Sequence, residues 1–223
     1  MRDVTKRVFD VAVAGTALVA SAPLLALASA AIKLESAGPV LFRQLRVGRG
    51  KVPIETLKLR TMVADADRRG PQITAGGDPR ITRVGRMLRK SKLDELPQLW
   101  NVLRGEMSLV GPRPEVPRYV EGYRAEWQKL FTVRPGITDL ASLVFRDEEA
   151  LLAGARDRER AYREVIMPMK LALAIQGVEQ SSLAHDLGVL ARTALSIAQY
   201  RAPAHDAILA EARRRIEALN RAT

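Results

Sequence analysis

The stretch from Val11 to Ile32, VAVAGTALVASAPLLALASAAI, contains no charged side chain and constrains the fold of this chain most strongly. At about 1.5 Å rise per residue, one helix of this length matches a hydrocarbon core about 30 Å thick. Pro23 lies near the middle of the stretch, where it removes a helical hydrogen bond. We therefore expect the stretch to bend or to break into two half-length helices.

Charged residues on both sides of the apolar stretch bear on its topology. Basic residues precede it and follow it: Arg2, Lys6, Arg7, Lys33, Arg43 and Arg46. Because positively charged flanks stay in the cytoplasm, the pattern favours a re-entrant hairpin that enters one leaflet and returns. Acidic residues nearby dilute the pattern, so a kinked spanning helix stays open. A cleavable secretory signal ending at Ala28-Ser29-Ala30 is a further alternative.

Composition narrows the class of protein. A chain of 223 residues can hold one catalytic domain beside a membrane element. The net charge of +11 indicates anionic partners, but aromatic residues make up only 4% and are not interleaved with the basic ones as base stacking requires. Anionic membrane lipids are thus favoured, and no nucleic acid is expected. The absence of cysteine excludes thiolate zinc sites and thiol catalysis, and His185 and His205 are expected on helix surfaces.

The segment SKLDELPQLWNVLRGEMSLVGPRPE, residues 91–115, is where we expect the chemistry. Apolar residues recur at helical spacing after the adjacent acids Asp94 and Glu95, and Pro97 suits a first turn. The acids are therefore predicted at a helix N-terminus, where the helix dipole favours ionised carboxylates. Two roles stay open for the pair. It can cap the helix, or it can act on an anionic substrate through a metal or as a nucleophile.

Arginines surround this acidic pair along the chain. Before it, arginine recurs at every third residue, at Arg80, Arg83, Arg86 and Arg89. Such a stripe is either a solvated helix face or a phosphate site. After it, the turn GPRPE presents Arg113 between two prolines, which suits a binding arginine.

The predicted fold class is α+β and predominantly helical. Residues 1–36 are expected to form the re-entrant helix-break-helix and residues 37–223 a compact cytoplasmic catalytic domain with amphipathic surface helices. A β-hairpin is predicted within 39–62, a loop at 63–79, and a strand-like piece ending at Arg146. Residues 150–223 should form its helical C-terminal part, with helices near 147–164, 168–180, 184–199 and 204–220.

Long blocks of this sequence resemble the bacterial sugar transferases that act on polyprenol phosphate, the monotopic phosphoglycosyl transferases. The blocks are KRVFD (6–10), GPVLFRQLRVGR (38–49), LKLRTM (57–62), DPRITRVGRMLRKSKLDELPQLWNVLRGEMSLVGPRPE (78–115) and RPGIT (134–138). The resemblance implies transfer of a phosphosugar from a UDP-sugar to undecaprenyl phosphate, releasing UMP, at the cytoplasmic face of the bacterial inner membrane. It also implies Mg²⁺ near Asp94 and a covalent aspartyl-phosphosugar intermediate, as a first step in glycoconjugate assembly.

The resemblance further implies roles for individual residues. Asp94 would be the nucleophile and Glu95 its partner in the dyad. The phosphates and nucleotide would meet Arg89, Arg113 and Arg146, with Lys58 and Arg60 as further candidates for substrate binding. Arg7 and Pro23 match the membrane element.

Two places depart from the pattern of the family. Ala22-Pro23 stands where many members have Ser-Pro, and GITDLASLVFR (136–146) stands where relatives often read GITGxAQVNGR. The second departure is expected to shape the sugar site. The sugar, the pathway, accessory partners and homodimer formation are left open. A non-catalytic basic protein that binds anionic membrane or nucleic acid remains the alternative.

Overall fold

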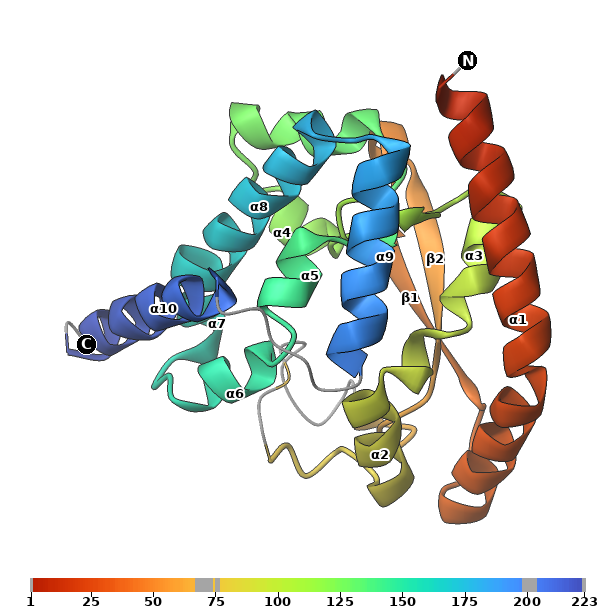
Figure 1. The fold of residues 1–223 in the computed structure, drawn as a ribbon. Helices are drawn as coiled ribbons and strands as arrows, with labels where there is room; N and C mark the ends of the chain where they lie inside the picture. Colours follow the sequence, from red (N-terminus) through yellow and green to blue (C-terminus); the bar gives the residue numbers. More distant parts are fainter. Residues whose placement is uncertain (1, 67–73, 75–76, 198–203, 222–223) are drawn as a thin grey trace.

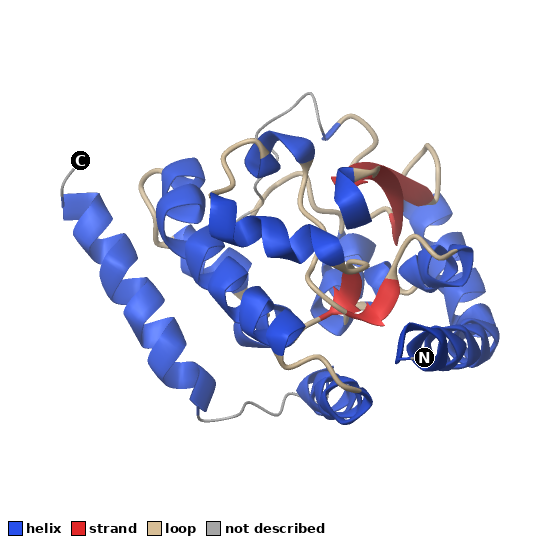
Figure 2. Ribbon diagram, turned by 90° about the horizontal axis from the view of Figure 1, so that it is seen from above, coloured by secondary structure: helices blue, strands red, loops and turns tan. Residues whose placement is uncertain are grey.

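The computed structural model of this chain describes residues 2–66, 74, 77–197 and 204–221. Most of the described residues form helices, which surround two small two-stranded sheets (Figure 1, Figure 2). Helix α1 lies along one edge of the molecule and helix α10 at the opposite edge (Figure 1). The predicted α+β class with a predominance of helix is confirmed.

Helix α1, Arg2–Glu35, is continuous and contains Pro23. It changes direction partway along (Figure 1). Proline supplies the physical reason, because it lacks the N–H that would close the helical hydrogen bond and its ring crowds the preceding turn. The predicted break is therefore wrong in its strict form, since the helix bends without interruption. The re-entrant path stays a prediction.

The two faces of α1 differ in what they contact. A narrow stripe is buried against the rest of the protein: Asp10, Ala14, Ala28 and Ile32. Large apolar side chains on other faces are exposed: Val4, Val8, Val11, Val19, Leu24, Leu27 and Leu34. Only 11% of the most apolar window of this helix is buried, and the helix is long and apolar enough to cross a membrane. Such a surface indicates membrane association.

The predicted hairpin is confirmed. Strands β1, Leu41–Val47, and β2, Pro53–Leu59, pair antiparallel, with Leu41 opposite Leu59. The short 3₁₀ turn η1, Arg49–Lys51, connects them. Ile54 and Thr56 are buried on β2, and Lys58 continues the same period of two, which directs its side chain to the inner face.

Three short helical elements carry the acidic segment: α2, Arg83–Ser91; the 3₁₀ turn η3, Leu93–Glu95; and α3, Gln98–Arg104. Gly85 lets α2 approach the end of β2, because a Cβ there would lie 2.0 Å from the Thr61 carbonyl oxygen. The prediction that Asp94 and Glu95 open the following helix needs correction. They form a separate turn, and Pro97 is the N-cap of α3.

The arginine stripe is also only partly a helix face. Arg80 precedes α2 and is buried, and its guanidinium pairs with Asp78 at 2.6 Å. Arg83, Arg86 and Arg89 do lie on α2. Residues 67–73 and 75–76 of the predicted loop lie outside the described residues.

A second sheet joins two distant motifs. Strands β3, Ser108–Val110, and β4, Gly136–Thr138, pair parallel. Their backbones continue into close contact at two glycines, since a Cβ on Gly136 would lie 2.1 Å from the Gly111 nitrogen. This contact sets the GPRPE turn beside the RPGIT segment, where a larger residue would force them apart.

Apart from β4, the elements of the C-terminal half are helical. Its elements are α4, Pro117–Val120; η4, Ala125–Thr132; α5, Leu140–Val144; α6, Glu148–Ala153; α7, Arg158–Ala161; the π-helix η5, Tyr162–Ile166; α8, Met167–Glu179; α9, Leu183–Ile197; and α10, Ala204–Arg221. The helices predicted at 168–180 and 204–220 are confirmed. The helix predicted at 184–199 is confirmed as far as Ile197, after which residues 198–203 lie outside the described residues. The one at 147–164 is divided, because Gly154 ends α6 and the Asp157 side chain caps α7. The strand-like piece before Arg146 is a strand only over 136–138 and continues as α5.

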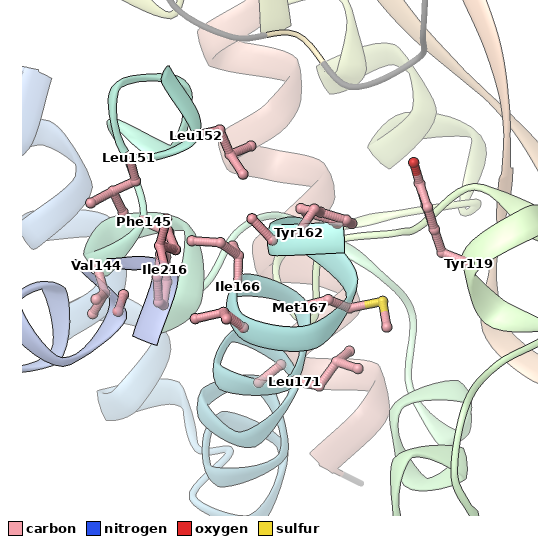
Figure 3. Packing of buried hydrophobic residues seen from close by; sticks show 14 of the residues in the cluster. Tyr119, Val144, Phe145, Leu151, Leu152, Tyr162, Ile166, Met167, Leu171 and Ile216 are labelled. Atoms are coloured by element: carbon pink, nitrogen blue, oxygen red, sulfur yellow. The ribbon is translucent and has the colours of Figure 1, made fainter. Parts of the chain in front are cut away.

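Three apolar clusters hold these parts together. The largest joins η5 and α8 to α5, α6 and α10, through residues such as Phe145, Leu152, Ile166 and Ile216 (Figure 3). The second packs α1 on α3, β3 and α9, and the third packs the C-terminal part of α1 on α2 and β2. Helix α1 thus shares two cores with the elements that carry the acidic segment.

Candidate active site

A cavity of 1320 Å³ brings together most of the residues predicted for the site. It is lined by elements from both halves of the chain. The predicted site residues on its wall are Lys58, Arg89, Asp94, Glu95, Arg113 and Arg146. Arg60 does not line it. His185 and His205, which were expected on helix surfaces, do not line it either.

The turn η3 places the two acids in the cavity wall. The chain enters the turn through Lys92, which adopts a left-handed conformation with φ 59°. A non-glycine residue there is strained, and such strain is retained when surrounding packing fixes the backbone. The sharp turn lets Asp94 and Glu95 follow α2 at once.

Glu95 is held by two cations. The Lys58 ammonium donates to Oε1 at 3.0 Å, and Arg113 donates to Oε2 at 2.9 Å and also to Oε1. Arg113 additionally donates to the Ile137 carbonyl at 3.2 Å. Burial alone would raise the pKa of Glu95, but the charges of Arg113 and Lys58 outweigh burial and hold that pKa well below its ordinary value. Glu95 is therefore an ionised structural centre whose oxygens are already occupied.

Asp94 has the opposite surroundings. It is 7% exposed, and its Oδ1 has no hydrogen-bond partner among the described residues. Burial, with the negative charge of Glu95 second, raises the pKa of Asp94, although Lys58 and Lys92 partly offset this. A buried carboxylate with a free oxygen is more reactive than a paired one, because no donor has to be displaced before it attacks.

Two further arginines approach from other elements. Arg89 of α2 donates to Thr61 Oγ1 at 3.1 Å and pairs with Glu149 of α6 at 2.7 Å. The Glu149 side chain is 45% exposed, so the ion pair is weak. Another anion can therefore replace Glu149 as the partner of Arg89 at little cost in free energy. Arg146 follows α5 and is partly buried in the wall.

Arg60 and Arg7 have different contacts from those of the cavity residues. Buried Arg60 donates to the carbonyls of Ala37 and, at 2.8 Å, of Ser36, just after α1. These contacts favour a structural role over substrate binding. Arg7 donates to the Val102 and Leu103 carbonyls at 2.6 and 3.0 Å, which fastens α1 to the end of α3.

The structure adds wall residues that sequence reasoning did not single out. Arg46 pairs with Glu115 at 3.2 Å and donates to the Pro114 carbonyl at 2.9 Å, and the Tyr162 hydroxyl also donates to Glu115. Lys170 of α8 pairs with Glu148 at 2.6 Å. Arg46 and Glu115 lie inside the quoted motifs, which was a signal. Tyr162 and Lys170 come from the segments predicted as helices at 147–164 and 168–180, for which no role in the site was predicted.

The described residues contain no group of three or more His, Asp or Glu side chains arranged to hold a metal ion. Of the two acids on η3, Glu95 is committed to cations. One carboxylate, Asp94, is thus left to contact a metal. That donor set still fits Mg²⁺, which keeps several waters and commonly binds through one or two carboxylates together with substrate phosphates.

Comparisons with known proteins bear on this cavity. The sequence model described as "Bacterial sugar transferase" matches residues 1–200. The chain is 44% identical over 200 residues to the UDP-glucose:undecaprenyl-phosphate glucose-1-phosphate transferase of Caulobacter vibrioides, covering 87% of this chain and 70% of the relative. Two longer relatives match over 62% of this chain. They are the UDP-N-acetylgalactosamine-undecaprenyl-phosphate N-acetylgalactosaminephosphotransferase of Aeromonas hydrophila (43% identical, 34% of it covered) and the UDP-glucose:undecaprenyl-phosphate glucose-1-phosphate transferase of Escherichia coli (44%, 30%).

The family match spans the apolar helix α1, the hairpin, both acids and the cavity-lining arginines. Helix α10 lies beyond it. The resemblance predicted from the sequence motifs is thereby confirmed. The chain belongs to the bacterial sugar transferase family and is a transferase enzyme.

Proposed function

We propose that this protein transfers a phosphosugar from a UDP-sugar to undecaprenyl phosphate, to begin assembly of a polysaccharide or another glycoconjugate. The named activities of the relatives support the donor and acceptor classes. UDP-glucose is the first donor to test, because the names of the Caulobacter and Escherichia relatives give it as their donor.

The free Oδ1 of Asp94, beside a Glu95 that is fully paired, is the observation that carries the proposal. Asp94 attacks the phosphorus that carries the sugar. A new bond forms between its carboxylate oxygen and that phosphorus, and the bond from phosphorus to the oxygen of the uridine phosphate breaks, so that UMP leaves. A phosphate oxygen of the acceptor then attacks the same phosphorus, which releases the Asp94 carboxylate and forms the lipid diphosphate sugar.

The cations of the cavity make attack by one anion on another feasible. Glu95 holds Arg113 and Lys58 beside the reacting carboxylate, and Arg89 can exchange Glu149 for a donor phosphate. Such fixed positive charge stabilises the charge that builds on the transferred phosphoryl group. Asp94, together with donor phosphates and water, would hold Mg²⁺, which would supply further charge neutralisation there.

The cavity also has an apolar side that suits a lipid acceptor. Val13 and Ala17 of the membrane-associated helix α1 line it, as do Leu99 of α3 and Leu190 of α9. A prenyl chain would be received between these surfaces while its phosphate meets Asp94. The basic flanks of α1 would keep the domain at the cytoplasmic face of the inner membrane.

Intact-mass analysis of the detergent-purified protein tests the covalent step. The wild type is incubated with Mg²⁺ and a panel of UDP-sugars without acceptor, beside Asp94→Asn. We expect a phosphosugar adduct on the wild type alone, which disappears when undecaprenyl phosphate is added.

Two results would contradict the proposal. An adduct on Asp94→Asn would exclude Asp94 as the nucleophile. Absence of UMP release from every donor, with acceptor present and the protein folded, would exclude the proposed transfer and leave the basic surface as a membrane-binding feature.

A further inference from the structure

Asp139 and Ser142 form a second polar pair in the cavity wall, apart from η3. Asp139 is 5% exposed, and its Oδ1 accepts a hydrogen bond from the Ser142 backbone nitrogen at 2.7 Å, which caps α5. Its other oxygen, Oδ2, and the Ser142 hydroxyl are both buried and have no hydrogen-bond partner among the described residues. Both side chains line the large cavity.

Unpaired buried polar atoms are rare in folded proteins, because each loses its hydrogen bonds to water without a replacement. In the described part of the cavity wall, three side chains carry such an atom: Asp94, Asp139 and Ser142. The first is the proposed nucleophile. The other two lie within one turn of each other, so an acceptor oxygen and a hydroxyl are available together.

The position of this pair relates it to the reacting end of the cavity. Glu95, and to a smaller extent Asp139, raises the pKa of Arg113, so Asp139 lies within electrostatic reach of the arginine that binds Glu95. Asp139 also lines a separate cavity of 170 Å³, but Ser142 lines only the large one. The pair as a unit therefore belongs to the large cavity.

The chemistry of the pair limits what it can bind. A carboxylate only accepts hydrogen bonds and repels phosphate, whereas a serine hydroxyl both donates and accepts. The ligand group must therefore carry no negative charge and must offer a donor, and the hydroxyl groups of a sugar meet both conditions. In a UDP-sugar the sugar ring is attached directly to the transferred phosphoryl group, while uracil is separated from it by ribose and a second phosphate.

We infer that Asp139 and Ser142 recognise a hydroxyl group of the transferred sugar and select donors that carry it, an inference that rests on the proposed function. A site that hydrogen-bonds a substrate hydroxyl discriminates strongly against analogues without it, because its own polar groups are then left unpaired. Asp139 and Ser142 are thus specificity-determining residues.

Asp139→Asn is the sharpest variant for a test. Asparagine caps helices as well as aspartate does, so α5 keeps its N-terminal hydrogen bond. With its oxygen on the Ser142 nitrogen, its amide places a donor where Oδ2 was an acceptor. Ser142→Ala is the companion variant, since it removes only the hydroxyl and leaves the backbone nitrogen in place.

UMP release is measured with the most active UDP-sugar and with its monodeoxy analogues, for the wild type and both variants. We expect Asp139→Asn to lower kcat/KM for the full sugar by about 10- to 100-fold. With the wild type, kcat/KM for one deoxy analogue should be lower than for the full sugar by a similar factor. With Asp139→Asn, kcat/KM should be the same for that analogue as for the full sugar, because the substitution and the missing hydroxyl remove the same hydrogen bond.

Two controls distinguish sugar recognition from other roles. Inhibition by UMP, which lacks the sugar, should keep its constant, and the Mg²⁺ concentration for half-maximal rate should not move. A shift in either quantity would overturn the inference. An unchanged kcat/KM in Asp139→Asn would also overturn it, as would a result in which the effects of the substitution and of the missing hydroxyl on kcat/KM are independent for every analogue. Should Asp139→Asn not fold, as judged by its thermal unfolding, Ser142→Ala decides by the same criteria. A wild type that releases no UMP from any donor would instead refute the proposed function itself.

Discussion

The two sides of the turn η3 carry neighbouring carboxylates in opposite surroundings. On one side, Glu95 is enclosed by Lys58 and Arg113, and its pKa is held low. On the other, Asp94 is buried with a free oxygen, and its pKa is raised. The difference indicates that one acid organises the site and the other is kept available to react, although they are adjacent in the sequence.

The largest expected effect separates the two acids by activity. Asp94→Asn should lower the rate of UMP release by at least about 1000-fold, because no other side chain takes over from a lost nucleophile. The measurement is initial rate of UMP release in detergent with Mg²⁺, donor and acceptor. A loss of less than tenfold would remove Asp94 from the role proposed for it.

Stability should separate them in the reverse direction. Glu95→Gln leaves without their counter-charge two cations whose side chains are only 19% and 27% exposed, and should lower the free energy of unfolding by about 3 kcal/mol. Asp94→Asn removes a buried, unpaired charge and should leave that free energy unchanged or raise it. Urea denaturation followed by tryptophan fluorescence measures both.

Glu55→Gln is the matched control for this comparison. Glu55 pairs with Arg43 at 3.4 Å, but both side chains are more than half exposed. Its removal should change the free energy of unfolding by less than about 0.5 kcal/mol. If Glu95→Gln were as mild as Glu55→Gln, the cluster around Glu95 would not be the organising centre described above.

The pH dependence should show the same contrast. Because the folded pKa of Glu95 lies well below its ordinary value of 4.5, its stabilising contribution is complete above that value and is lost as pH falls toward the folded pKa. For Asp94 the sign is reversed. Its folded pKa lies above the ordinary 3.8, so a destabilising contribution develops as pH rises from that value through the folded pKa.

Asp94 must be ionised to attack, so kcat/KM should decline as pH falls through its raised pKa. Acid titrations of the wild type and Glu95→Gln, followed by unfolding midpoint and by UMP release, check both statements. An activity profile that stays flat down to the pH of acid unfolding would contradict the raised pKa of Asp94.

The smallest effect concerns the exposed pair between Arg89 and Glu149. Glu149→Gln frees Arg89 for a donor phosphate, so the donor KM should fall by about two- to fivefold with kcat unchanged, in keeping with a surface ion pair of modest strength. The same substitution in an Arg89→Ala background should have no effect on KM. If Glu149→Gln still lowered the donor KM in the Arg89→Ala background, the effect would come from the loss of a negative charge near the cavity and not from Arg89.

Sequence patterns predicted the segments that local interactions determine. The hairpin around Gly50, the helix after Pro97 and the C-terminal helices follow from turn chemistry and apolar periodicity, which act over a few residues. Predictions that extended such patterns across a local stop were wrong. Gly154 and the Asp157 cap divide the helix predicted at 147–164. The left-handed Lys92 begins the turn η3, so the acids lie in a turn of their own before Pro97 caps α3.

The hydrogen-bond partners of individual arginines could not be predicted from such local patterns. Arg60 and Arg113 are both arginines within quoted motifs, yet Arg60 holds the carbonyls after α1 and Arg113 holds Glu95. No local pattern distinguishes them, because each contact joins residues that are 18 or more positions apart along the chain.

The sequence by itself determined the apolar helix with its basic flanks, the predominantly helical class, the family and the segment that carries the two acids. All of these depend on composition, short-range periodicity or motif identity. Only the tertiary structure decided which acid is paired and which is free, which arginines line the cavity, and that Asp139 and Ser142 meet there. Burial and electrostatic fields decide these properties, and both arise from contacts between residues that are distant in the sequence.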